Sequence, residues 1–187
     1  MKIVAISGSL RSASSNTALV RAALAAAPPE VETALYDGLA GLPHFSPEMD
    51  GDAAPAAVRD FRAQIASADG VFFCTPEYAY GIPGSLKNAL DWLVTSGELW
   101  RKPVAALSAS PSALGGAKAH AALLLTLSAL EAEAAEAASL QIPFVTTKLN
   151  AEKEVSDGET LAALGASLAA LVQAVEEKQA REAKENE

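Results

Sequence analysis

Short apolar runs alternate along the chain with longer stretches of helical periodicity. Runs bounded by turn residues predict buried strands at residues 2–7, 71–75 and 103–108, and weaker runs predict strands at 31–36 and 137–142. The helical stretches between them are rich in alanine and leucine and cover residues 15–26, 55–67, 83–94, 116–130 and 157 to about 180. This repeated alternation predicts a doubly wound α/β domain, with helices on both faces of a parallel sheet.

Two segments stand outside the alternation. Residues 42–55 (LPHFSPEMDGDAAP) hold three prolines and show no periodicity, which predicts a loop at the carboxyl edge of the sheet and a candidate lid. Residues 176–187 have mixed charges and no apolar face, so we expect the last helix to fray and residues 181–187 to form a charged tail. No second composition zone divides the chain, and we expect one domain over residues 1–180.

Charge and cysteine content narrow the classes of function. With 14 basic and 23 acidic residues among 187, the net charge of −9 argues against sequence-independent nucleic-acid binding, and any anionic ligand must be held locally. The single cysteine, Cys74, excludes an internal disulfide and a cysteine zinc cage. We found neither a signal-peptide core nor an apolar stretch of the roughly 18 to 20 residues that a membrane span needs. We therefore expect a cytoplasmic protein that binds no membrane.

The loop at residues 7–17 (SGSLRSASSNT) resembles an anion cradle in composition. Hydroxyls of Ser9, Ser14 and Ser15 can donate to phosphate oxygens together with the unpaired N–H groups of the following helix, and Arg11 adds charge. The loop matches neither the GxGxxG nor the Walker A pattern. A solvated serine loop with ordinary helix caps is the alternative. The position between the first strand and the first helix favours the phosphate interpretation.

The loop after the third strand, residues 75–85, combines aromatic side chains with rigid backbone. Tyr78 and Tyr80 precede a turn containing Gly81 and Pro83. A planar heterocycle could lie against the tyrosines while backbone groups bind its polar edge. The alternative is a turn whose tyrosines cover the end of the sheet.

The loop after the fourth strand ends in two glycines at a helix start. Ser110 and Ser112 precede Gly115 and Gly116, which allow close approach of the backbone. The helix N-terminus could stabilise the negative charge that a flavin gains at N1 on reduction. A flexible loop before a helix is the alternative.

We expect structural roles for the other conspicuous side chains and assign no catalytic side chain and no metal ligand. No Ser-His constellation or metal-ligand spacing accompanies them. Packing, surface or turn roles are favoured for Cys74, Glu77, His44 and His120, and packing or subunit contact for Trp92 and Trp100.

Three motifs, GSLRSASSN (8–16), PEYAYGIPGSLKNALDW (76–92) and LGGAK (114–118), occur in an order and spacing that resemble the NADPH-dependent FMN reductase family of flavodoxin-like proteins. The family includes chromate- and quinone-reducing members, and the resemblance covers roughly residues 1–145. It implies a flavodoxin-like three-layer α/β/α fold with a five-stranded parallel sheet in the order 2-1-3-4-5.

The resemblance also implies non-covalent FMN as cofactor, with NADPH or NADH as co-substrate. By motif match, and with Ser15 from the cradle, the phosphate contacts would be Ser9, Arg11, Ser14, Ser15 and Asn16. The flavin ring would be lined by Pro76, Glu77, Tyr78 and Ala79, with Ser110, Gly115 and Gly116 approaching from the fourth loop. The chain departs from the family pattern at Ala79, where asparagine is frequent, and at Ser112 and Lys118.

The activity that this resemblance implies is hydride transfer from NAD(P)H to flavin N5. Two electrons then pass to a quinone, an azo compound, a metal oxyanion or free flavin. The family implies a homodimer or homotetramer, with the helix carrying LKNALDW at a subunit contact. The alternative is an electron-carrying flavin module that does not oxidise NAD(P)H.

Overall fold

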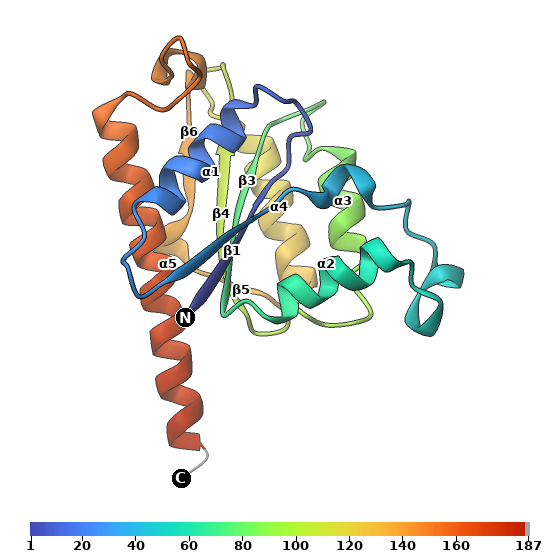
Figure 1. Cartoon of the computed structure of the whole chain (residues 1–187). Coiled ribbons are helices and arrows are strands. Elements are labelled where there is room, and N and C mark those ends of the chain that lie inside the picture. Colours follow the sequence, from blue (N-terminus) through green and yellow to red (C-terminus); the bar gives the residue numbers. More distant parts are fainter. Residues whose placement is uncertain (186–187) are drawn as a thin grey trace.

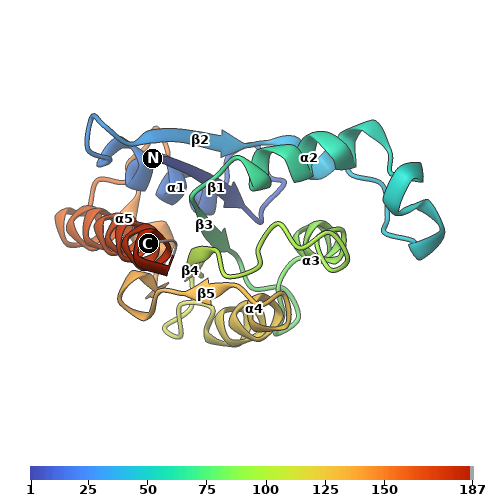
Figure 2. The same ribbon diagram turned by 90° about the horizontal axis from the view of Figure 1, so that it is seen from below.

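A computed structural model describes residues 1–185 as three layers, a parallel sheet between two layers of helices (Figure 1; Figure 2). The strands are β1 Lys2–Ser7, β2 Glu32–Tyr36, β3 Gly70–Thr75, β4 Pro103–Ala109, β5 Glu133–Ala134 and β6 Leu140–Ile142. They lie in the order β2-β1-β3-β4-β5, and β6 also pairs with β4. This order confirms the flavodoxin-like topology that the sequence predicts.

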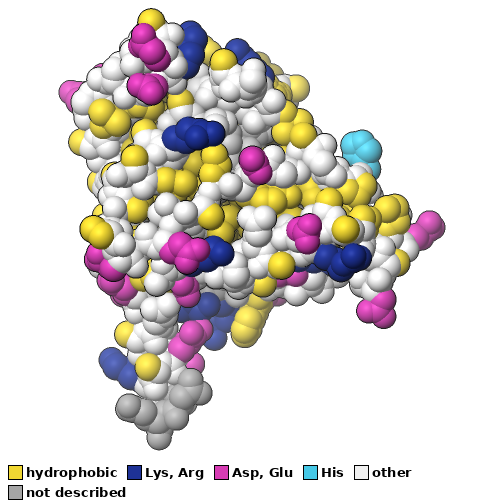
Figure 3. Space-filling model, in the orientation of Figure 1, with side chains coloured by type: hydrophobic (Ala, Val, Ile, Leu, Met, Phe, Trp, Pro, Cys, Tyr) yellow, Lys and Arg dark blue, Asp and Glu magenta, His cyan; other side chains and the backbone are white. Residues whose placement is uncertain are grey.

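The α-helices are α1 Ser15–Ala25, α2 Ala56–Ala66, α3 Gly84–Asp91, α4 Ala117–Ala129 and α5 Gly158–Glu185. The helices α1 and α5 cover one face of the sheet, and α2, α3 and α4 cover the other. Short 3-10 helices lie at Gly38–Gly41, Pro47–Met49, Gly51–Ala53, Glu136–Ala138 and Val145–Lys148. Acidic and basic side chains are mixed over the face that carries α1, β2 and α5 (Figure 3).

Two hydrophobic cores explain why the central strands are continuously apolar. In β1, Ile3 and Ala5 belong to the core beneath α1 and α5, whereas Val4 and Ile6 belong to the core beneath α2, α3 and α4. Successive side chains of a strand point to opposite faces. Because helices cover both faces, an uninterrupted apolar run is the expected pattern.

The predicted fifth strand at 137–142 is only partly correct. Two short strands, β5 and β6, pair with β4, and the 3-10 helix Glu136–Ala138 separates them. The carbonyl oxygen of Ala138 accepts a hydrogen bond from Ser167 Oγ of α5 at 2.5 Å. This carbonyl is therefore bound by a helix and not by a neighbouring strand, which interrupts the ladder.

The last helix differs from expectation at its end. α5 continues to Glu185, beyond residue 180, where we expected it to fray. Arg181 Nη2 lies 2.9 Å from Glu133 Oε2, which ties this part of the helix to β5. The Ala, Glu, Lys and Arg of this segment also favour helix. Residues 186–187 of the expected tail lie outside the described residues.

The helix α5 is long and apolar enough to cross a membrane by length and composition, although we expected no such stretch from the sequence. Its buried positions include Leu164, Leu168, Leu171 and Val175, which recur at intervals of three and four. This spacing forms a stripe on one side of the helix that packs into the core beneath α1 and α5. The core-facing stripe and the abundant alanine account for the composition.

The segment 42–55 is attached to α3 and is not a free lid. The carbonyl of Pro43 accepts hydrogen bonds from Trp92 Nε1 and Asn88 Nδ2, both at 2.9 Å. Asn88 Oδ1 in turn accepts a bond from the Phe45 N–H at 2.8 Å. Phe45 packs edge-on against Trp92, with ring centroids 5.1 Å apart. Trp92 is fully buried by these contacts, which agrees with a packing role, one of the two roles expected for it.

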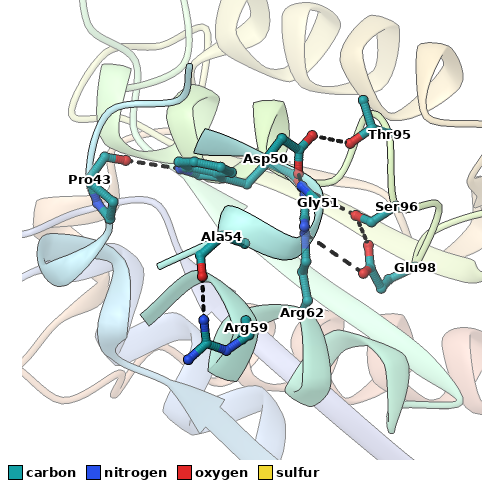
Figure 4. Close-up of polar contacts among 10 residues, drawn as sticks. Pro43, Asp50, Gly51, Ala54, Arg59, Arg62, Thr95, Ser96 and Glu98 are labelled. Carbon is teal, nitrogen blue, oxygen red and sulfur yellow. Dashed lines mark hydrogen bonds and ion pairs between the residues drawn. The ribbon is translucent and has the colours of Figure 1, made fainter. Parts of the chain in front are cut away.

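A carboxylate fixes the far end of the same segment (Figure 4). Asp50 Oδ1 accepts bonds from Arg62 Nη2 and the Gly51 N–H, both at 2.7 Å, and Asp50 Oδ2 accepts one from Thr95 Oγ1. Arg62 Nε also donates to the carbonyl of Trp92 at 2.9 Å. The hydroxyl of Thr95, then the Arg62 guanidinium and the Gly51 N–H, lower the pKa of Asp50 to about 2.

Candidate cofactor site

The carboxyl ends of β1, β3 and β4 bring the three predicted loops to one edge of the sheet (Figure 1). Ser7 pairs with Cys74, and Thr75 pairs with Ser108. The Gly8 N–H donates to the carbonyl of Cys74 at 2.8 Å and continues the pairing into the first loop. The three loops therefore begin side by side, where parallel α/β sheets bind ligands.

The first loop leads into a helix N-terminus with unpaired donors. Ser14 caps α1, because its Oγ accepts a hydrogen bond from the Thr17 N–H at 3.3 Å. In the described part of the chain, the N–H groups of Ser15 and Asn16 have no acceptor. The first N–H groups of a helix attract anions. Serine capping and anion binding are thus compatible here, because the cap uses the N–H of Thr17.

Side chains of the same loop supply further donors. The Arg11 side chain is exposed, and its guanidinium has no hydrogen-bond or ion-pair partner within residues 1–185. Ser9 Oγ accepts the Arg11 N–H at 3.4 Å, which leaves its own hydroxyl hydrogen free to donate. We did not foresee that Thr17 Oγ1 donates to Ser7 Oγ at 2.8 Å and ties the helix to the end of β1.

The third loop is a tight hairpin turn. The backbones of Tyr78 and Gly81 exchange two hydrogen bonds of 3.0 Å. Ala79 and Tyr80 between them have φ of 49° and 63°, the left-handed region in which residues other than glycine are strained. Tyr78 is 50% exposed and Tyr80 is 79% exposed, so both side chains keep at least half of their surface open. Pro76 is buried beneath the turn.

Glu77 joins the third loop to α4. Its Oε2 accepts hydrogen bonds from the N–H groups of Lys118 and Ala119, at 2.9 and 3.1 Å. The Ala117 N–H is also used, because it donates to the carbonyl of Leu114 at 3.0 Å. The N–H groups of Ala117, Lys118 and Ala119 at the start of α4 therefore already have acceptors within this chain. A carboxylate already occupies two of them, and Glu77 has the structural role that we favoured.

The glycines of the fourth loop approach other parts of this chain closely. Gly115 and Gly116 have φ of 58° and 81°. A Cβ on Gly115 would lie 3.0 Å from the backbone nitrogens of Ile142 and Pro143, so no side chain fits there. Ser108 Oγ donates to the carbonyl of Gly115 at 2.8 Å. The fourth loop is therefore fixed against the end of β6 and is not a flexible loop.

A second set of bonds fixes the serines of this loop. Ser110 Oγ accepts the Ser112 N–H at 3.1 Å, and the Ser110 N–H donates to the carbonyl of Ile142 at 3.2 Å. The Phe144 N–H donates to the carbonyl of Ser112 at 3.2 Å. The support from residues 142–145 was not foreseen, because no motif marks that segment.

Two cavities adjoin the first loop. One of about 170 Å³ lies between the loop and the end of β2, and Ser9, Arg11 and Asp37 are among its lining residues. The other, of about 620 Å³, runs along α1 toward residues 152–155 and includes Ser14. The cradle is therefore accessible from two sides.

The two histidines lie away from the three loops. His120 is buried in α4, with Nε2 3.0 Å from the carbonyl oxygen of Ala106, as its expected packing role requires. His44 is an exposed residue of the segment 42–55. Within residues 1–185, no group of three or more His, Cys, Asp or Glu side chains could hold a metal ion.

The sheet order defines a flavodoxin-like domain, and its first loop leads into the open N-terminus of α1. A sequence profile described as NADPH-dependent FMN reductase matches residues 1–147, most of the chain. The chain belongs to the NADPH-dependent FMN reductase family. This membership confirms that it is an oxidoreductase with FMN as cofactor and NAD(P)H as reductant.

Individual proteins support the assignment. An NAD(P)H-dependent FMN reductase of Pseudomonas aeruginosa is 35% identical over 173 residues, which are 91% of this chain and 93% of that protein. A 2-hydroxy-1,4-benzoquinone reductase of a Burkholderia species is 40% identical over 126 residues, 66% of this chain and 68% of that protein. The solved structure of FerB, a flavoenzyme NAD(P)H:(acceptor) oxidoreductase of Paracoccus denitrificans, superposes with a TM-score of 0.83 at 28% identity and covers 94% of this chain and 97% of that one.

Proposed function

We propose that this protein is an NAD(P)H-dependent FMN oxidoreductase whose acceptors are quinones and related small molecules. An azo compound, a metal oxyanion or free flavin is the alternative acceptor that the family resemblance implies. The observation that carries the proposal is that the N–H groups of Ser15 and Asn16 and the guanidinium of Arg11, in or next to the first loop, have no partner within residues 1–185. Family membership and relatives named quinone reductase support the choice of acceptor.

The first loop would hold the FMN phosphate. The N–H groups of Ser15 and Asn16 would donate to phosphate oxygens, and the hydroxyls of Ser9, Ser14 and Ser15 would add donors without bulk. Arg11 would neutralise negative charge of the phosphate and supply several N–H donors in one plane. These residues fit a phosphate because each one retains a donor after its contacts within the protein are counted.

The other two loops would form the walls of the ring pocket. Pro76, Glu77, Tyr78 and Ala79 would line one side, and Ser110, Gly115 and Gly116 would approach from the other. When bound there, FMN supplies the redox chemistry by taking a hydride from NADPH or NADH and passing two electrons to the acceptor. Glu77 fixes the spacing of the walls, because its carboxylate binds the backbone at the start of α4. Its role would be positional, and no side chain is assigned as acid or base.

The chain would act as one cytoplasmic FMN-binding domain over residues 1–180 within a homodimer or homotetramer. Exposed apolar side chains near α3 and α4 support an assembly surface. Tyr80 lies before α3, Val94 follows it at 60% exposure, and Leu125 on α4 is 75% exposed. Large apolar side chains that a single chain leaves exposed are often covered at subunit interfaces. The net charge of −9 gives no support for a nucleic-acid partner.

The test is FMN retention followed by turnover. Purified protein is loaded with FMN, desalted and supplied with NADPH or NADH and a benzoquinone. The proposal predicts bound flavin and nucleotide oxidation that depends on both protein and quinone. Bound flavin without nucleotide oxidation would identify the electron-carrier alternative. Failure to bind FMN together with absence of turnover would contradict the proposal.

A further inference from the structure

Asn16 is a buried polar side chain inside the phosphate cradle. It is the second residue of α1, and 5% of it is exposed. Its Oδ1 accepts a hydrogen bond from Cys74 Sγ at 3.2 Å. Its Nδ2 has no acceptor within residues 1–185. No buried side-chain nitrogen or oxygen within residues 1–185 lacks a partner, so Nδ2 itself reaches solvent and is available as a donor to a ligand of the cradle.

The partner thiol lies at the end of β3, fully buried in the core beneath α1 and α5. Burial raises the pKa of the Cys74 thiol well above its ordinary value, which keeps the group protonated. A protonated thiol is a weak donor and a still weaker acceptor. Its contact with Asn16 therefore favours the amide orientation in which oxygen faces Cys74 and the NH₂ group faces away.

We propose that Cys74 is a positioning residue of the cofactor site, whose S–H fixes the Asn16 amide so that Nδ2 donates to the FMN phosphate. The inference rests on the proposed phosphate site and adds to it a core residue that touches neither cofactor nor substrate. It gives a function to a thiol that the sequence alone suggests is inert.

The side chain of Cys74 can be tested separately from its backbone. The backbone carbonyl of Cys74 accepts the Gly8 N–H at 2.8 Å, and a side-chain substitution leaves that bond in place. Valine is of similar size, suits a buried strand and lacks a donor. Serine keeps a donor on a shorter side chain. Cys74→Val and Cys74→Ser therefore separate hydrogen bonding from packing.

The experiment measures the dissociation constants of FMN and riboflavin for the full-length apoprotein by quenching of flavin fluorescence. Riboflavin lacks only the phosphate, so it reports on the contacts of the ring and the ribityl chain. We expect Cys74→Val to weaken FMN binding about 3- to 10-fold, the effect of one lost hydrogen bond, and to leave riboflavin binding unchanged. The dissociation constant of FMN for Cys74→Ser should stay closer to that of the wild type. In an Asn16→Ala background, Cys74→Val should have no further effect on FMN.

A matched control is Val71→Ala, a core substitution at the opposite end of β3. It should lower thermal stability without changing the ratio of FMN to riboflavin affinity. An unchanged ratio in Cys74→Val, or an equal loss of FMN affinity with and without Asn16, would overturn the positioning role. If the wild type itself shows no preference for FMN over riboflavin, the phosphate site fails and this inference fails with it.

Discussion

At the scale of single residues, Arg11 is the positively charged side chain of the loop that leads into α1. Its guanidinium has no hydrogen-bond or ion-pair partner within residues 1–185. Arg11→Ala should weaken FMN binding about tenfold or more, since a charge-assisted bond to phosphate is lost, and should leave riboflavin binding unchanged. Fluorescence titration measures both constants. Arg11→Lys keeps the charge but loses the planar set of N–H donors. Its FMN affinity should therefore lie between those of the wild type and Arg11→Ala. Equal FMN affinity in the alanine variant and the wild type would contradict the assignment.

Ala79 is a second residue with a measurable consequence, this time for stability. Its φ of 49° is unfavourable for a residue with a Cβ. Ala79→Gly should raise the free energy of unfolding of the apoprotein by about 1 kcal/mol, because glycine adopts this conformation without strain. Urea denaturation measures the difference.

The control for Ala79→Gly is Ala121→Gly, at an exposed position of α4 with ordinary helical backbone. That substitution should destabilise the protein by about 1 kcal/mol. A loss of stability in both variants would show that the turn at Ala79 is not strained.

At the scale of elements, the carboxylate of Asp50 holds the segment 42–55 against α2 and the end of α3. Hydrogen bonds from Thr95, Arg62 and Gly51 lower its pKa to about 2, below the value near 4 of an unfolded chain. The bound carboxylate therefore stabilises the fold fully above about pH 4, and this contribution is lost as the pH falls through about 2. Asp50→Asn should cost about 1 kcal/mol at pH 7 and progressively less below pH 4.

Urea unfolding of the wild type and Asp50→Asn from pH 7 to pH 2.5 measures this dependence. Asp52→Asn, at an exposed carboxylate nearby, should leave the difference from wild type close to zero throughout. A constant gap between Asp50→Asn and wild type at every pH would show that the ionised carboxylate is not the stabilising group.

The elements that the sequence predicts well are those whose composition is determined by local packing. Apolar runs locate β1, β3 and β4 to within a residue or so, because helices cover both faces of each strand. The divided strand pair β5 and β6 was not predictable, since the break depends on the contact between Ala138 and Ser167. The helical end of α5 was likewise missed, because Arg181 finds its partner Glu133 on a distant strand.

At the scale of the whole molecule, the site likewise has some features that local sequence predicts and others that depend on contacts between distant residues. The three motifs predict which loops meet, because parallel strands end at one edge of the sheet. Contacts between loops could not be predicted. Glu77 binds the N–H of Lys118, 41 residues along the chain, and Cys74 binds Asn16, 58 residues away. Each contact depends on strand order and helix placement, which no local pattern encodes.

Assembly is also a property of the whole molecule. The proposed oligomer should have a native mass that is a multiple of the 19.2 kDa chain. Leu125→Glu places a charge on the exposed apolar side of α4 and should shift the mass toward the single chain, as measured by light scattering. Leu161→Glu on α5, 41% exposed, is the matched control and should leave the mass unchanged. A wild-type mass of 19.2 kDa would contradict the proposed assembly.

Anaerobic reduction of the flavin-loaded protein shows whether this fold holds FMN where NAD(P)H can reduce it. Protein loaded with FMN and desalted is titrated with NADPH and then, in a separate sample, with NADH, while the visible absorbance of the flavin is followed. We expect a yellow protein whose flavin absorbance is lost on addition of about one equivalent of at least one nucleotide. Retained flavin whose spectrum is unchanged by either nucleotide would contradict it.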